Sequence, residues 1–173
     1  MSQTQLMQNK QLLLILLLIN SMFMQAQNRI EQALDEYADG SVEYISTDEL
    51  AKLISNNQNV QILDTRKKEE FEVSRLENAI HVGYKNFEIN QFQDQLNINQ
   101  QIIVYCSIGV RSEEIGEKLK TAGFENVKNL RGGLFKWFNE DRQIIDDNDK
   151  STHNIHGYNK KWSRYLKRGE VVY

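Results

Sequence analysis

Short apolar runs alternate with amphipathic segments along most of the chain. Apolar runs of four or five residues predict strands, and apolar residues at three- and four-residue spacing predict helices. The predicted strands are 42–45, 60–63, 79–82, 101–105 and 127–130, and the predicted helices are 30–38, 47–54, 68–73, 87–96, 112–122 and 134–138. This alternation predicts an α/β fold with a mostly parallel central sheet flanked by helices on both faces.

Two reactive residues directly follow predicted strands. Asp64 comes after the strand at 60–63, and Cys106 comes after 101–105, the most apolar strand in the chain. In open parallel sheets, functional groups lie at the carboxyl ends of the strands. We therefore expect Asp64 and Cys106 to lie at the edge of the sheet that carries the site.

The N-terminus has the three parts of a secretory signal. Lys10 precedes the apolar run 12–19, and Ala26 is a small residue at a suitable cleavage point. The apolar run is shorter than the roughly 20 residues that cross a bilayer. We predict that residues 1–26 are removed, that the mature protein is periplasmic or secreted, and that residues 27–43 form a lead-in helix. An uncleaved membrane anchor is the alternative.

Composition narrows the possible functions. The chain is 40% hydrophobic and 26% charged, which is enough apolar material for one core and typical of a globular domain. Its net charge of −3 argues against general binding to nucleic acid. The single cysteine excludes an intramolecular disulfide and zinc sites built from paired cysteines. No motif predicts a cofactor or a metal.

The segment 106–112, CSIGVRS, carries the most informative chemistry. It places a thiol on a short loop between a buried strand and the start of a helix, where free backbone N–H groups favour an anion. The same field favours the nucleophilic thiolate of Cys106. Gly109 permits a turn that other residues resist, and Arg111 adds a fixed cation. A buried core cysteine is the simpler alternative.

This loop resembles the active loop of the single-domain rhodaneses, a sulfurtransferase family with the pattern C-x-x-G-x-R-[ST]. Other segments resemble further family motifs in the correct order: the D-x-R of 64–66, the E-[FY] of 70–71, the N-A-x of 78–80 and the G-G-x-x-x-W of 132–137. The resemblance covers about residues 44–140 and implies a rhodanese-like fold for that stretch. Residues 141–173 then form a C-terminal extension.

The resemblance implies a persulfide mechanism. Cys106 attacks a donor such as thiosulfate and carries the outer sulfur to a thiophilic acceptor, while Arg111 helps to hold the charged group. The implied substrate-binding residues are the rest of the loop: Ser107, Ile108, Gly109, Val110 and Ser112. Asp64 and Arg66 are implied to be supporting residues. The physiological donor and acceptor are not encoded in any motif.

Two other functions compete with sulfur transfer. A non-catalytic or redox-sensing module that binds a partner through the same loop is favoured if Cys106 is buried. A phosphatase-like hydrolase is disfavoured because four residues separate Cys106 from Arg111, whereas the related phosphatases carry five.

The chain departs from the family pattern beside the third predicted strand. Ser74, Arg75 and Leu76 stand where the family commonly has G-H-[IL], and Gly83 stands where a proline often closes that strand. The family's histidine is neither nucleophile nor base. The change at Arg75 therefore concerns local packing and charge rather than catalysis.

The extension has an aromatic and basic pattern of its own. Ile155, Tyr158, Trp162 and Tyr165 recur at three- and four-residue spacing, which predicts an amphipathic helix over 154–166. Such a stripe most often packs onto its own domain. The alternative is contact with an anionic membrane surface or with a partner protein.

Overall fold

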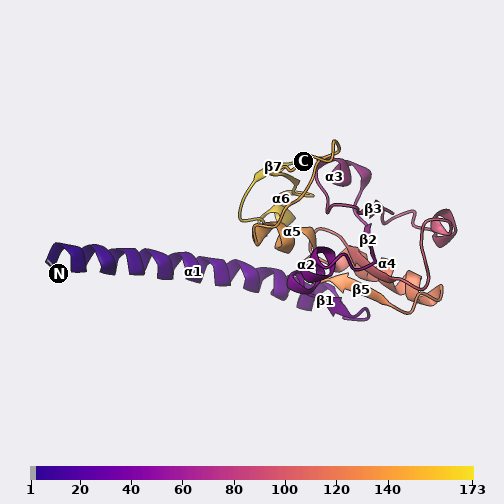
Figure 1. Ribbon diagram of the computed structural model, residues 1–173, viewed down its shortest axis with the longest axis horizontal. Helices are drawn as coiled ribbons and strands as arrows, with labels where there is room; N and C mark the ends of the chain where they lie inside the picture. The colour runs from indigo at the N-terminus through magenta and orange to yellow at the C-terminus, as the bar shows by residue number, and fades with distance from the viewer. Residues whose placement is uncertain (1–2) are drawn as a thin grey trace.

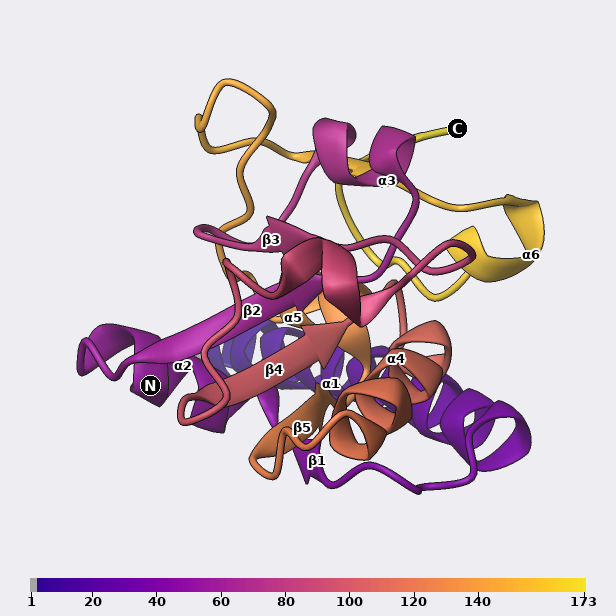
Figure 2. The ribbon, with the colours of Figure 1, turned by 90° about the vertical axis from the view of Figure 1, so that its right-hand side faces the viewer.

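The structure is a computed structural model that describes residues 3–173. Its centre is a parallel sheet of five strands in the order β1-β5-β4-β2-β3 (Figure 2). The strands are β1 (Tyr44–Ile45), β2 (Val60–Asp64), β3 (Ile80–His81), β4 (Gln101–Tyr105) and β5 (Val127–Leu130). The predicted strands are confirmed with small changes at their ends, and so is the α/β fold.

Helices cover both faces of this sheet. The helices of the core are α2 (Thr47–Ser55), α3 (Lys68–Val73), α4 (Val110–Thr121) and α5 (Gly133–Asn139). On one face, α2 and α5 pack against Ile103 and Tyr105 of β4, and on the other face α4 packs with Ile102 and Val104. Successive residues of β4 thus bury opposite faces, as strand geometry requires. Continuous burial explains why β4 is almost entirely apolar.

The first helix is longer than expected. It runs unbroken as α1 (Gln3–Tyr37), and its N-terminal part projects away from the rest of the protein (Figure 1). Its last turns enter the core, where Ile30, Ala33 and Leu34 are buried. Within residues 3–173, no helix is both long and apolar enough to cross a membrane. Residues 1 and 2 of the predicted signal lie outside the described residues.

The helix predicted over 87–96 is wrong. Only a four-residue 3-10 helix, η1 (Ile89–Phe92), forms there, and turns follow it. The apolar residues still pack inward, with the rings of Phe87 and Phe92 stacked 5.7 Å apart. Gln61 of β2 fixes the end of this segment by donating to the Gln95 carbonyl at 2.8 Å. Its side-chain oxygen also accepts the N–H of Asn97 at 2.8 Å.

The amphipathic helix predicted over 154–166 is also wrong. The segment forms β6 (Asn154–His156), which pairs in parallel with β7 (Glu170–Val172), and then the short helix α6 (Lys160–Ser163). Gly157 follows β6 at a point where β7 lies very close. An added Cβ there would be 2.6 Å from the Val171 side chain, so this position requires glycine. The expected packing onto the domain is confirmed, since Ile155 and Tyr165 are buried in the main core.

Candidate active site

The loop at 106–109 joins β4 to α4 and wraps its backbone around one sulfur atom. The N–H of Gly109 donates to the Sγ of Cys106 at 3.2 Å. Gly109 has a φ of +110°, which other residues rarely adopt. A Cβ at this position would also lie 3.2 Å from the side chain of Leu34 and 3.4 Å from the carbonyl oxygen of Leu130. The turn predicted at Gly109 is therefore present, and it requires glycine.

Helix α5 holds the other side of the loop. The N–H groups of Leu134 and Phe135 donate to the carbonyls of Cys106 and Ser107, each at 2.9 Å. A side chain at Gly133 would collide with the Cys106 carbonyl oxygen, so glycine allows this close approach. Because α5 binds these loop carbonyls, the loop conformation is fixed before any substrate arrives. In this conformation the Gly109 N–H points at the sulfur.

A buried polar pair fixes the start of α4. The Ser112 hydroxyl donates to the side-chain oxygen of Asn129 at 2.8 Å, and the Asn129 amide donates to the Gly109 carbonyl at 2.7 Å. Both side chains are fully buried. Sequence reasoning missed Asn129, although a polar residue within a buried strand was an available signal. Its role here is to position the loop.

Arg111 is bound by the carboxylate of Glu70, which the sequence analysis named only as part of the E-[FY] motif. Its guanidinium donates to both oxygens of Glu70, at 2.8 and 2.9 Å, and to the Ser107 hydroxyl at 2.9 Å. Glu70 is fully buried on α3. Arg111 is therefore held by a bidentate pair, and its charge is partly balanced before an anionic donor arrives. A signal for Glu70 was its place in the E-[FY] motif.

The surroundings of Cys106 favour its thiolate. Burial, the largest influence, raises the pKa of the thiol, but the charge of Arg111 and hydrogen bonds from Ser112 and Gly109 hold that pKa below its ordinary value. A lowered thiol pKa increases the fraction of Cys106 that is in the nucleophilic thiolate form near neutral pH.

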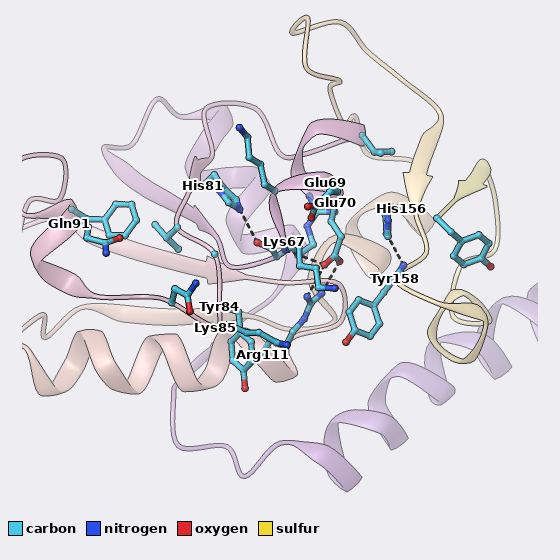
Figure 3. Close-up of a pocket in the computed structure, with 18 residues that line it drawn as sticks. Lys67, Glu69, Glu70, His81, Tyr84, Lys85, Gln91, Arg111, His156 and Tyr158 are labelled. Atoms are coloured by element: carbon cyan, nitrogen blue, oxygen red, sulfur yellow. Dashed lines mark hydrogen bonds and ion pairs between the residues drawn. The ribbon is translucent and has the colours of Figure 1, made fainter.

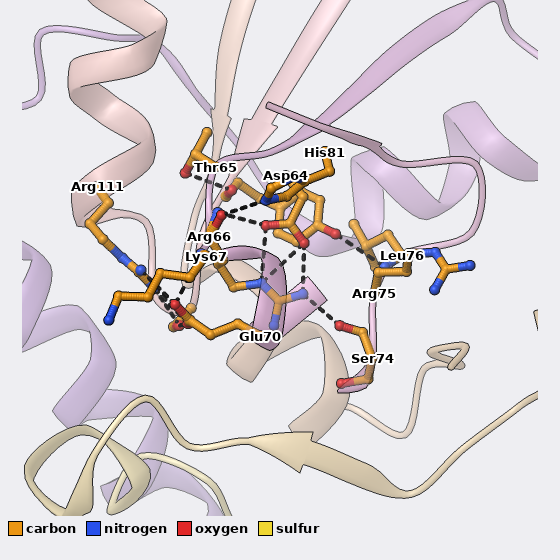
Figure 4. A network of polar contacts seen from close by, with 12 residues as sticks. Asp64, Thr65, Arg66, Lys67, Glu70, Ser74, Arg75, Leu76, His81 and Arg111 are labelled. Carbon is orange, nitrogen blue, oxygen red and sulfur yellow. Dashed lines mark hydrogen bonds and ion pairs between the residues drawn. The ribbon is translucent and has the colours of Figure 1, made fainter. Parts of the chain in front are cut away.

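Asp64 and Arg66 form a buried ion pair (Figure 4), and neither lines the small pocket at Cys106. Both are fully buried, and the Arg66 guanidinium donates to the Asp64 carboxylate at 2.6 Å and to the Ser74 carbonyl at 2.5 Å. The carbonyl of Arg66 in turn lies 2.9 Å from His81 Nε2. The pair thus ties the end of β2 to α3 and β3. This geometry suits the supporting role implied by the sequence.

Cys106 lies at the base of a small pocket of about 120 Å³, the Cys106 pocket, and is only 1% exposed. The pocket is lined by Cys106, Ser107, Ile108, Val110, Arg111, Tyr158 and Trp162. Of the predicted binding residues, Ser107, Ile108 and Val110 therefore face this space, whereas Gly109 and Ser112 shape it from behind.

A much wider cleft of about 1010 Å³ adjoins the Cys106 pocket at Arg111 and Tyr158 (Figure 3). Its lining includes several cationic or ionisable side chains, among them Lys67, Lys68, Lys85, His81 and His156. Within residues 3–173, no group of three or more His, Cys, Asp or Glu side chains is arranged to hold a metal ion.

Comparison with known proteins decides the family. The model of the Rhodanese-like domain matches residues 46–140, more than half of the chain. The chain belongs to the rhodanese-like domain family. A rhodanese-like domain protein from Staphylococcus aureus has 30% identity and a TM-score of 0.50, over 55% of this chain and 90% of that one. A thiosulfate sulfurtransferase from Pseudomonas aeruginosa shares the fold with 22% identity and a TM-score of 0.57, over 64% and 21% of the two chains.

The curated relatives have different names and different stated roles. A tRNA uridine(34) hydroxylase of Listeria welshimeri is 34% identical over 53% of this rhodanese-like chain and 30% of its own length. A Bacillus subtilis protein, YrkF, whose name proposes a sulfur carrier role, is 29% identical over 56% and 51%. The matched part of this chain therefore spans 30% of the first relative and about half of the second. The family supports a sulfur-related enzyme or carrier.

Proposed function

We propose that the protein is a sulfurtransferase that carries sulfane sulfur on Cys106. The observation that carries this proposal is the cradle around Sγ, in which a Gly109 N–H points at the sulfur and Arg111 lies beside it. The same N–H groups and the charge of Arg111 stabilise a persulfide anion, whose negative charge lies on the outer sulfur, one S–S bond beyond Sγ.

The reaction proceeds in two displacements. The Cys106 thiolate attacks the outer sulfur of thiosulfate, a new S–S bond forms, the S–S bond of thiosulfate breaks, and sulfite leaves with the bonding pair. A thiophilic acceptor such as cyanide then attacks the outer sulfur of the persulfide, which yields thiocyanate and restores the thiolate. No net oxidation or reduction by a further reagent is needed.

The experiment is intact mass spectrometry of the purified protein after incubation with thiosulfate and then with cyanide. We expect a gain of one sulfur atom at Cys106, followed by its loss as thiocyanate. Cys106→Ser keeps the size of the side chain and is the matched control, which should gain no sulfur. Sulfur uptake by Cys106→Ser at the wild-type rate would sink the mechanism.

A binding or redox-sensing module remains the second candidate, and one observation favours it. Cys106 is only 1% exposed, and a buried thiol reacts slowly with large donors. If neither thiosulfate nor inorganic polysulfide adds sulfur while hydrogen peroxide oxidises Cys106 reversibly, this second function replaces sulfur transfer. Sulfur uptake from either donor would instead support the first.

We also propose that the protein is exported, with cleavage after Ala26. The supporting features are the signal-like pattern of residues 1–26 and the burial of Ile30, Ala33 and Leu34, which all lie after the cleavage point. N-terminal sequencing of the protein from the periplasm of an expressing bacterium should begin at Gln27. An intact N-terminus in the membrane fraction would instead identify an anchor.

A further inference from the structure

The C-terminal extension completes the wall of the Cys106 pocket. The family match ends at residue 140, yet two of the residues that line the pocket, Tyr158 and Trp162, come from beyond it. They share the lining of the pocket with the apolar loop residues Ile108 and Val110. The space above the sulfur is therefore bounded on one side by the rhodanese-like domain and on the other by the extension.

Tyr158 is held over the key cation of the site. Its ring centroid lies 4.7 Å from the guanidinium carbon of Arg111, a distance at which cation–π attraction is effective. Its backbone has a φ of +62°, in the left-handed region that a bulky residue rarely adopts. The Tyr158 N–H donates to Nδ1 of His156 at 3.0 Å, which helps to hold this conformation. The ring is thus fixed in place despite an unfavourable backbone.

Trp162 is supported from two directions. Its ring packs edge-on against Tyr37 at the end of α1, with centroids 5.5 Å apart, and against Tyr165 at 5.7 Å. The side chain of Asn159 accepts the N–H groups of Lys161 and Trp162 and so caps α6, which carries the tryptophan. Because Tyr165 is buried in the core, Trp162 belongs to a packed aromatic cluster and forms a firm wall.

We propose that Tyr158 and Trp162 determine substrate specificity by admitting only slender sulfur donors to Cys106. This inference rests on the proposed sulfur transfer and assigns the size limit to the extension. A cavity of about 150 Å³ is enough for a benzene molecule, and the Cys106 pocket is smaller, at about 120 Å³. It accommodates a transferred sulfur with a small group such as methyl behind it, whereas a phenyl group exceeds this volume and meets the two rings unless it turns toward the wider cleft at Arg111 and Tyr158.

Two thiosulfonates test this size limit. Methanethiosulfonate and benzenethiosulfonate react in the same way, because the thiolate takes the outer sulfur and a sulfinate leaves, but they differ in bulk. We expect kcat/KM of the wild type to favour the methyl compound on the order of tenfold or more, within the range that pocket shape provides. Trp162→Ala and Tyr158→Gly should each reduce that preference severalfold.

The variants are chosen to keep the fold. Tyr158→Gly removes the ring at a positive φ, where glycine is unstrained, and Tyr158→Phe retains the ring and should retain the wild-type preference. Glu170→Ala removes an exposed side chain of the extension that lines neither the Cys106 pocket nor the wider cleft. It should leave the ratio of the two kcat/KM values unchanged. An unchanged ratio in both Trp162→Ala and Tyr158→Gly would overturn the proposal.

A second readout needs no sulfur transfer. Because Cys106 is the single cysteine of the chain, its alkylation by iodoacetamide and by the bulkier N-phenyl iodoacetamide can be followed by mass without ambiguity. Each reaction forms a C–S bond and releases iodide. We expect the phenyl reagent to be disfavoured in the wild type and to recover in Trp162→Ala.

The two readouts separate the two proposals. Size discrimination in alkylation without any sulfur uptake would reject the sulfurtransferase and keep the wall formed by the extension. Sulfur uptake with no discrimination by size, in either assay, would reject the wall and keep the sulfurtransferase.

Discussion

Arg111 interacts with two acidic groups, the Glu70 carboxylate and the Cys106 thiol. It is paired with the buried carboxylate of Glu70 and also lowers the pKa of the Cys106 thiol. The Glu70 pair fixes the guanidinium in one place, so that its field reaches the sulfur from a constant direction. At the scale of single residues, positioning of Arg111 is thus the main contribution of α3 to the site.

Loss of the Arg111 charge should raise the pH at which Cys106 becomes reactive. Because the thiolate is the reactive form, the rate of alkylation by iodoacetamide reports the thiol pKa as its midpoint. Removal of an adjacent opposite charge moves such a pKa by about 1–3 units. We expect the midpoint of Arg111→Gln to rise by at least about one unit.

Two controls accompany this measurement. The double variant with Arg111→Gln and Glu70→Gln leaves a neutral pair and should show the same raised midpoint. Lys118→Gln removes a charge two turns further along α4, where the lysine pairs with Glu114, and should leave the midpoint unchanged. A wild-type midpoint in Arg111→Gln would show that the backbone N–H groups alone stabilise the thiolate.

Glu70 should contribute stability at neutral pH that is lost in acid. Burial raises the pKa of Glu70, but hydrogen bonds and charge from Arg111 outweigh it and hold the pKa below the ordinary value of 4.5. A lowered carboxyl pKa stabilises the folded state above pH 4.5, and this contribution disappears as the pH falls through the lowered value. Breaking a buried pair costs about 3 kcal/mol.

Urea unfolding of Glu70→Gln tests this expectation. Its free energy of unfolding should lie about 3 kcal/mol below that of the wild type at pH 7, and the difference should shrink below pH 4.5. Glu72→Gln is the control on the same helix, because Glu72 is half-exposed and its lysine partner is 3.6 Å away. A difference that stays constant down to acid pH would contradict a role for the ionised carboxylate.

At the scale of elements, local signals predicted most of the fold. The helix predicted over 47–54 forms as α2, and a capping box starts it, because Ser46 and Glu49 bind each other's backbone N–H groups. The spacing of apolar residues also predicted the positions of β2, β4 and α4. Each of these elements is specified by its own local sequence, and the loop after β4 is positioned by β4 and α4, which flank it.

The failures occurred where distant contacts decide the structure. Gln61 binds backbone groups of the segment predicted as the helix 87–96, and the pairing of β6 with β7 replaces the helix predicted over 154–166. In the site, Glu70 is 41 positions before Arg111 and reaches it only in the folded chain. Tyr158 and Trp162 were predicted to lie on the apolar face of a helix, but their spacing alone could not show that they line the Cys106 pocket.

The end of α1 should matter to stability and its beginning should not. Leu34 is 2% exposed and contacts the position that Gly109 must leave free of a side chain. Leu34→Ala should lower the free energy of unfolding by about 2–5 kcal/mol. In the uncleaved chain, Leu13 lies on the projecting part and is 58% exposed, so Leu13→Ala should change the free energy of unfolding by less than about 0.5 kcal/mol.

Chemical unfolding of the two leucine variants in urea provides the measurement. Equal and small effects would mean that α1 is not part of the cooperative core. Because Leu34 also contacts the active loop, its alanine variant should lose alkylation selectivity as well as stability, whereas Leu13→Ala should lose neither.

At the scale of the whole molecule, the extension is joined to the domain at several points. Arg75, which replaces the histidine of the family pattern, forms a backbone bridge with Ile145 and donates to the Asp146 carbonyl at 2.6 Å. Asn139 donates to the Tyr165 carbonyl at 2.8 Å. The departure at Arg75 is therefore explained by packing, because it binds the segment that leads to the pocket wall.

This joining predicts that the extension and the domain unfold together. Ile155 is completely buried in the same core cluster as Phe138 and Leu134. Ile155→Ala removes apolar volume that the rigid surroundings cannot refill, and should lower the free energy of unfolding of the whole protein by about 2–5 kcal/mol. Hydrogen exchange followed by mass spectrometry should show residues 154–166 opening at the same free energy as the central sheet.

The alternative is an extension that opens on its own, as loosely joined segments do. In that case residues 154–166 would exchange well before β4 in the wild type, and Ile155→Ala would accelerate their exchange without changing that of the sheet. Such a result would also make the wall of the Cys106 pocket a transient one, and the size preference for sulfur donors would then fall as the temperature rises. A preference that persists up to the unfolding transition, with matched exchange in both regions, fits a wall built into the core.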